Sequence, residues 1–183
     1  DRDGLVVEDG LRRAPDFRLA FVTPAHQQPL GVSMSIERRF ALLNAADRNN
    51  AFIIEDDYDS EFRYSGQPPP TLKGIDNLGR VIYVGTFSKT LFPALRLGFF
   101  LAPTQLVDVF NRVSKALLQG VPSSHQAVVA AFMQEGHFAT HIRRMRQIYA
   151  ERHQVLCDTA QKRLGGLLDI VPTDTGLHTI ARI

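Results

Sequence analysis

The stretch from residue 80 to residue 101 constrains this chain more than any other part of its sequence. It opens with an apolar, largely β-branched run over residues 81–84, which is typical of a buried strand. A polar cluster follows over residues 85–90, and a second apolar run covers residues 97–101. Because α/β proteins commonly place reactive groups on the connection after a buried strand, Lys89 is the first candidate for chemistry.

The neighbours of Lys89 suggest what it can do. Three apolar side chains flank it and are expected to desolvate its ammonium group in part, which favours the neutral amine: Phe87, Leu91 and Phe92. A neutral lysine amine can form a Schiff base with an aldehyde. Three further side chains carry hydroxyl or guanidinium groups that suit a phosphate: Thr86, Ser88 and Arg96. A solvated loop lysine is the alternative for an isolated Ser-Lys-Thr.

A run of carboxylates forms the second candidate site. Residues 51–54 predict a short buried strand, and Glu55, Asp56 and Asp57 follow at its end, where parallel sheets bind ligands. Three adjacent carboxylates repel one another, so a partner is expected. That partner can be a hard metal cation, or a pyridinium nitrogen that an aspartate keeps protonated. A helix N-terminus or a solvated turn is the purely structural alternative.

Three motifs carry a resemblance to a known family. They are residues 85–98 (GTFSKTLFPALRLG), residues 53–64 (IIEDDYDSEFRY) and residues 22–31 (VTPAHQQPLG). The first resembles the lysine region of fold-type I pyridoxal-phosphate (PLP) enzymes, the aspartate aminotransferase superfamily. All three together are similar to the aminotransferase-like domain of MocR-type regulators in the GntR family. The resemblance covers most of the chain, from about residue 17 onward.

The resemblance implies a cofactor site. It implies PLP bound as an aldimine on Lys89, with Asp56 at the pyridinium nitrogen and Tyr58 donating a hydrogen bond to the 3-hydroxyl group. The residues that it places at the cofactor phosphate are Thr86, Ser88 and Arg96. It therefore favours the pyridinium over the metal as partner of the carboxylates, and no metal is expected. Asp57 and Asp59 are expected to be structural.

The order of apolar and polar segments predicts an α/β fold, a mostly parallel sheet with flanking helices. In the helix expected over residues 35–48, Arg39 is expected to point away from the core. In the helix expected to begin at residue 123 or 124, residues 127–133 are expected to be buried. The segments expected are a turn-rich lead-in (1–15), strands (16–23, 51–54, 81–84, 97–102, 167–171, 176–183) and helices (35–48, 104–118, one beginning at 123 or 124, 138–164). The family resemblance implies that residues 1–140 are the later half of a PLP-transferase large domain. It implies that residues 141–183 are a connecting helix and the beginning of the small domain.

Composition excludes several classes of protein. The net charge of +2 is too small to indicate a nucleic-acid surface, so DNA is expected to be bound only through a domain absent from this chain. The single cysteine, Cys157, excludes an internal disulfide and fits the cytoplasm. No apolar run is long enough for a membrane span. Because the chain begins with Asp1 rather than Met, we expect it to be a piece of a longer protein.

Three functions fit these observations. The first is a PLP-binding domain of a transcription regulator that senses an amine or amino-acid ligand, and the superfamily implies a homodimer. The second is a catalytically active class I/II aminotransferase, in which Lys89 also moves a proton. The third is an α/β interaction domain with an inert lysine. The lysine, aspartate and tyrosine serve the first two alike, so the sequence leaves enzymatic activity open.

Overall fold

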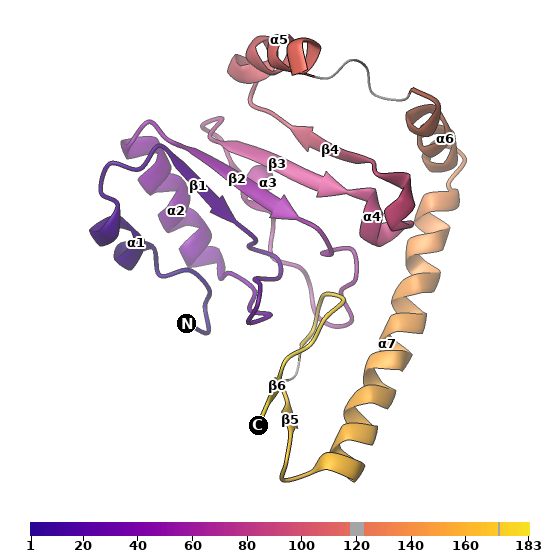
Figure 1. The fold of residues 1–183 in the computed structure, drawn as a ribbon. Helices are drawn as coiled ribbons and strands as arrows, with labels where there is room; N and C mark the ends of the chain where they lie inside the picture. The colour runs from indigo at the N-terminus through magenta and orange to yellow at the C-terminus, as the bar shows by residue number, and fades with distance from the viewer. Residues whose placement is uncertain (118–122, 172) are drawn as a thin grey trace.

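The computed structural model describes residues 1–117, 123–171 and 173–183. Its centre is a four-stranded sheet in the order β1-β2-β3-β4 (Figure 1). The strands are β1 (Leu19–Val22), β2 (Phe52–Asp57), β3 (Val81–Thr86) and β4 (Gly98–Leu101). The first three run parallel, while β4 is antiparallel to β3. The prediction of a mostly parallel α/β sheet is therefore confirmed.

Helices surround the sheet, and a small hairpin follows them. The α-helices are α1 (Val7–Arg13), α2 (Ile36–Arg48), α3 (Leu72–Ile75), α4 (Phe87–Thr90), α5 (Val107–Leu117), α6 (Ser123–Gln134) and α7 (His137–Leu164). Two 3-10 turns are Pro93–Leu95 and Thr104–Leu106, and the hairpin consists of β5 (Asp169–Ile170) and β6 (Ala181–Arg182). In Figure 1, α1 and α2 lie on the β1 side of the sheet, and α7 runs down to the hairpin.

The core lies between α2 and the sheet. The Ser35 side chain accepts a hydrogen bond from the Arg38 backbone N–H and so begins the helix, while Asn49 ends it. The helix buries an apolar face made of Leu42, Leu43, Ala45 and Ala46. This face packs with Ile53 and Val81 of the two central strands. The helix predicted over residues 35–48 is confirmed.

Arg39 corrects one expectation, since its side chain is buried in the core and not turned away from it. Its guanidinium group donates to three backbone carbonyl oxygens, those of Met34 (3.0 Å), Pro24 (2.8 Å) and Pro70 (3.2 Å). Glu55 lies 3.8 Å away and compensates the charge. Helical spacing alone did not show that the loop before α2 and the loop before α3 would both place carbonyl groups around this one side chain.

Several boundaries differ from the predictions. The segment expected to be a turn-rich lead-in contains α1, which buries Val7. The β2 strand continues through the acidic run to Asp57, because β3 pairs with it from Ile53 to Asp57. The C-terminal strands are much shorter than expected, with two residues each. The helix predicted over residues 138–164 is confirmed as α7.

The outer helices are less buried than their apolar sequences indicated. Within residues 127–133 only Val129 is buried, so the prediction of a buried run is wrong. The first of these helices, α5, has no buried residue in its described span, and Leu118 lies outside the described residues. Both edge strands also expose large apolar side chains, among them Phe21 and Phe100. None of the helices described here combines the length and apolarity needed to cross a bilayer.

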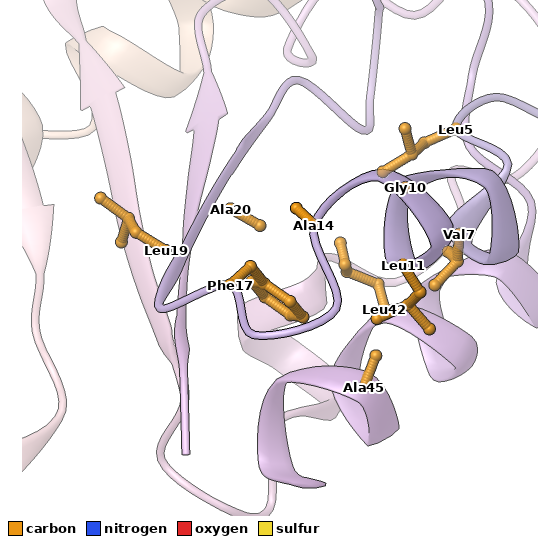
Figure 2. A pocket seen from close by; sticks show the side chains of 10 residues that line it. All are labelled: Leu5, Val7, Gly10, Leu11, Ala14, Phe17, Leu19, Ala20, Leu42 and Ala45. Atoms are coloured by element: carbon orange, nitrogen blue, oxygen red, sulfur yellow. The ribbon is translucent and has the colours of Figure 1, made fainter. Parts of the chain in front are cut away.

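An apolar pocket of about 180 Å³ opens between α1, α2 and β1 (Figure 2). Its lining consists of ten residues: Leu5, Val7, Gly10, Leu11, Ala14, Phe17, Leu19, Ala20, Leu42 and Ala45. Apart from backbone groups this lining carries no acid, base or hydrogen-bonding side chain. The pocket therefore extends the core and offers no groups for chemistry.

Candidate functional site

A larger pocket lies at the edge of the sheet where the three parallel strands end, and we call it the lysine pocket. Its volume is about 540 Å³. Its lining consists of Leu5, Phe21, Val22, Thr23, Gln27, Gln28, Asp56, Tyr58 and Lys89. The carboxyl ends of parallel strands are the usual ligand-binding edge of an open α/β sheet. The structure thus brings Asp56, Tyr58 and Lys89 together from segments far apart in the sequence.

The alternation of β2 divides the acidic run between two faces. Glu55 and Asp57 are buried, whereas Asp56 between them is only partly buried. The Glu55 carboxylate accepts hydrogen bonds from the backbone N–H groups of Leu72 and Lys73 at 2.8 Å, so it caps α3. These bonds offset the cost of burying that carboxylate.

Asp57 is bound by the protein itself. Its carboxylate accepts hydrogen bonds from the Ser60 hydroxyl at 2.6 Å and from the Tyr83 hydroxyl at 2.8 Å. The Ser60 backbone N–H adds a third bond at 3.2 Å. The expectation that Asp57 is structural agrees with these contacts, because its acceptor capacity is used within the fold.

Asp56 is different, and it tests whether this pocket suits a pyridine-type cofactor. In the described part of the chain, no group donates a hydrogen bond to its carboxylate. Burial raises the pKa of Asp56 above its ordinary value, and the negative charges of Asp57 and Asp59 raise it further. A carboxylate in this state gains from a cationic N–H donor. The Asp56 carboxylate, as an acceptor without a donor, therefore fits a protonated ring nitrogen.

Tyr58 follows β2 and lies on the same side as Asp56. Its hydroxyl group donates to the backbone carbonyl of His26 at 2.7 Å. Burial raises the pKa of the phenol, and the charge of Asp59 raises it further, so the hydroxyl stays protonated. Donation to a ring hydroxyl would require this proton to turn away from the His26 carbonyl.

Lys89 belongs to α4, a single helical turn directly after β3. The Thr86 side chain caps this turn by accepting a hydrogen bond from the Ser88 backbone N–H at 3.1 Å. The His141 imidazole lies 2.9 Å from the carbonyl oxygen of Thr90, which ties α7 to α4. The Lys89 side chain is exposed, so the expected desolvation by its apolar neighbours is wrong for this chain.

The three residues expected at a phosphate lie outside the lining of the lysine pocket. Thr86 and Ser88 are partly buried at the start of α4, and Thr86 already uses its oxygen for the cap. Arg96 is exposed and follows the 3-10 turn in a left-handed backbone conformation, with φ of 49°. Their role in binding phosphate stays a prediction.

The sequence analysis included residues 22–31 in the family resemblance but did not predict that Phe21 of β1 also lines the lysine pocket. Phe21 and Thr23, at the end of that strand, and Gln27, in the following loop, all line it. The signal was available in principle, because a parallel neighbour of β2 must end at the same edge of the sheet. What the sequence did not give is which strand pairs with β2.

Comparison with protein families gives a match that spans nearly the whole chain. The family described as aminotransferase class I and II matches residues 6–182.

Curated relatives include transcription regulators. The probable rhizopine catabolism regulatory protein MocR of Rhizobium meliloti is 48% identical over 182 residues, which are 100% of this chain and 36% of that protein. The pyridoxine biosynthesis transcriptional regulator PdxR of Corynebacterium glutamicum is 36% identical over 183 residues, covering 98% of this chain and 38% of the regulator. The chain thus spans less than two fifths of either relative.

Solved structures with the same fold include aminotransferases. The kynurenine aminotransferase of Pyrococcus horikoshii, in complex with PMP, superposes with a TM-score of 0.86 at 28% identity. An archaeal alanine:glyoxylate aminotransferase gives a TM-score of 0.85 at 27% identity. Each match covers 96% of this chain and 45% of the solved one.

Proposed function

Because this chain belongs to the aminotransferase class I and II family, whose fold is that of type I PLP-dependent transferases and whose cofactor is pyridoxal 5′-phosphate, we propose that it is the cofactor-binding part of a MocR-type transcription regulator. The observation that carries the proposal is the meeting of Asp56, Tyr58 and Lys89 in one pocket. Similarity to two regulators over almost the entire chain supports it.

Lys89 has the central role in this proposal. When bound, PLP supplies an aldehyde that reacts with amines and a ring that withdraws electrons. Lys89 provides the amine that attaches the cofactor to the protein. Its place on α4, held by the Thr86 cap and by His141, fixes the lysine backbone at the mouth of the pocket. An amine or amino-acid ligand would compete with Lys89 for that attachment.

Asp56 and Tyr58 orient the cofactor ring in the proposed site. The Asp56 carboxylate holds a proton at the ring nitrogen, and binding this cation lowers the cost that burial imposes on the carboxylate. Tyr58, whose hydroxyl is held by the His26 carbonyl, positions its oxygen beside the ring hydroxyl. We assign the phosphate to Thr86, Ser88 and Arg96, which requires their side chains to turn toward the pocket.

The finer parts of the proposal concern the whole protein. We propose that residues 1–140 belong to the large domain of the transferase fold and residues 141–183 to a connecting helix and the start of a small domain. We also propose a cytoplasmic homodimer that binds DNA through a part of the protein outside this chain. The two regulators among the relatives support this arrangement, since each is more than twice as long as the matched segment.

A catalytically active aminotransferase is the second candidate. The observation in its favour is the close superposition on aminotransferase structures. In that case Lys89 would also carry a proton to and from the substrate. Conversion of an amino acid to its keto acid by the full-length protein would distinguish an enzyme from a regulator that only binds its ligand.

Reduction with borohydride tests the attachment residue directly. The purified chain is incubated with PLP, its visible absorption is recorded, and the lysine–cofactor bond is reduced and located by peptide mapping. We expect the label on Lys89, and none in Lys89→Ala. Lys115→Ala is the matched control, because Lys115 is exposed on α5. This substitution is expected to leave the labelling of Lys89 unchanged. Equal labelling of the Lys89→Ala variant would refute the assignment.

A further inference from the structure

Three titratable residues outside the proposed cofactor site come together from distant parts of the chain. His26 lies in the loop after β1, Asp59 follows β2, and His178 belongs to the C-terminal segment between β5 and β6. In Figure 1 this segment returns to the carboxyl edge of the sheet. His26 and Asp59 are each 1% exposed, and His178 is partly buried.

The contacts within this cluster are specific. His26 Nδ1 lies 3.0 Å from Asp59 Oδ2, and the same oxygen accepts a hydrogen bond from the Leu177 backbone N–H at 2.9 Å. The imidazole rings of His26 and His178 stack, with centroids 4.1 Å apart and an angle of 26° between their planes. Gly176 makes this approach possible, because a Cβ atom there would lie 1.9 Å from His26 Nδ1.

The cluster also leaves buried polar atoms unsatisfied. Within the described residues, His26 Nε2, Asp59 Oδ1 and His178 Nε2 are buried and have no hydrogen-bonding partner. Buried polar atoms are nearly always paired, since leaving one unpaired costs about 1–3 kcal/mol. Three such atoms in one cluster indicate that a bound group completes their coordination.

A cavity the size of one atom adjoins the two histidines. Its volume is about 10 Å³, and His26, Gly31 and His178 are among the residues that line it. A Cβ atom at Gly31 would lie 3.2 Å from His26 Nε2, so the glycine keeps the space next to this nitrogen open. A space of this size holds one water molecule or one ion.

We propose that this cavity is a binding site for a single transition-metal cation, such as Zn²⁺, with the nitrogen atoms of His26 and His178 as ligands. One donor atom from each histidine and one oxygen of Asp59 lie within 4.8 Å of one another. A modest movement of His178 therefore brings the two histidine nitrogens to coordination distance from one metal ion. Imidazole ligands select Zn²⁺, Ni²⁺ or Cu²⁺ over Mg²⁺ and Ca²⁺.

Asp59 is the positioning residue of the proposed metal site. By accepting a hydrogen bond from His26 Nδ1–H, its carboxylate directs Nε2 away from itself, which is how carboxylates orient metal-binding histidines. A metal here would join the C-terminal segment to the loop after β1. The loop carries the His26 carbonyl that holds Tyr58, so the site lies next to the lysine pocket without sharing a ligand with it.

A pair of residues on α7 could bind the same ions. Cys157 and His153 lie one turn apart on α7, with Sγ 3.8 Å from His153 Nε2. This pair offers a sulfur ligand, whereas the proposed site offers only nitrogen and oxygen. The difference gives the experiment its control.

Equilibrium dialysis of the metal-free chain against Zn²⁺, in the absence of PLP, measures the site independently of the proposed function. We expect one ion bound per chain, and loss of that ion in His178→Ala. Asp59→Asn is expected to weaken binding by about 10- to 100-fold, since the orienting carboxylate is lost. The double variant His153→Ala, Cys157→Ser keeps the same stoichiometry. Circular dichroism checks that each variant is folded.

Cobalt substitution in the unmodified chain gives a second readout that needs no variant to fold. Co²⁺ at the proposed site shows ligand-field absorption without a thiolate-to-cobalt charge-transfer band. A charge-transfer band would move the metal to Cys157 and overturn the proposal. So would the absence of any Zn²⁺ binding, which would leave the cavity as a site for water.

Discussion

Asp56 and Asp57 are consecutive residues of β2, yet their carboxylates lie on opposite faces of the sheet. Asp57 is buried and accepts hydrogen bonds from Ser60 and Tyr83, whereas Asp56 lines the lysine pocket. The same chemical group therefore stabilises the fold at one position and is available to a ligand at the next.

Asparagine at these two positions should have opposite effects on stability. Without cofactor, Asp56→Asn is expected to raise the free energy of unfolding by about 0.5–1 kcal/mol, since it removes a partly desolvated charge at a binding site. Asp57→Asn should lower it by about 1.5–3 kcal/mol, because hydrogen bonds to a charged acceptor are lost. Urea unfolding at neutral pH measures both, and a shift of both variants in the same direction would contradict the division of roles.

The pH dependence of the Asp56 effect follows from its raised pKa. Because the folded chain binds the Asp56 proton more tightly than the unfolded chain does, the charged carboxylate costs stability above its folded pKa. Below the unfolded pKa, near 4, both states are protonated and the cost disappears. The gain in Asp56→Asn should therefore shrink as the pH falls through this window. A gain that is constant with pH would mean that the charge is not its cause.

Replacement of Arg39 by methionine should destabilise the chain strongly. The guanidinium group is buried and donates to the carbonyls of Met34, Pro24 and Pro70. Its loss removes three hydrogen bonds to buried carbonyl groups and the positive charge that compensates Glu55, at a cost of about 3–5 kcal/mol.

Arg38→Met is the matched control for Arg39→Met in the same helix. Arg38 forms ion pairs near the surface, with Glu8 at 2.8 Å and Asp1 at 3.4 Å. Such pairs contribute up to about 1 kcal/mol. Chemical unfolding of the two variants should differ by several kilocalories per mole, and similar values would show that burial does not decide the role of Arg39.

Alanine at Gly176 should displace the C-terminal segment from His26. Gly176 has φ of 89°, and its Cβ would lie 1.9 Å from His26 Nδ1, so both strain and overlap oppose the substitution. Overpacking typically costs about 1–3 kcal/mol beyond the strain. Gly166→Ala is the control, since Gly166 has φ of 84° and nothing within 4 Å of an added Cβ. Equal thermal stabilities of the two variants would show that the contact with His26 is unimportant.

His178 should make the stability of the chain depend on pH. Burial lowers the pKa of His178, and the neighbouring His26 lowers it further. The unfolded chain therefore binds this proton first, and the stability present above about pH 6.5 is lost as the pH falls below it. His178→Asn should reduce the decline in unfolding free energy between about pH 7 and pH 5. Parallel declines in both proteins would assign the pH dependence to other groups.

The sequence determined the type of fold and the most informative residues of the candidate site. The apolar runs of β2 and β3, the polar cluster around Lys89 and the spacing of the helices predicted a mostly parallel α/β sheet. Two-residue alternation along a strand also separates Asp56 from Asp57, since neighbouring side chains must face opposite ways. These features depend on local spacing, which a sequence records directly.

Only the tertiary structure decided which distant groups meet. Arg39 reads as a surface residue of an amphipathic helix, yet its guanidinium group donates to three carbonyl groups from two separate loops. His26, Asp59 and His178 have no common motif. They meet because Gly176, which has no side chain, lets the C-terminal segment pass close to the His26 imidazole. The exposure of Lys89 and of residues 127–133 was likewise hidden, because burial depends on which other elements cover a segment and not on the segment itself.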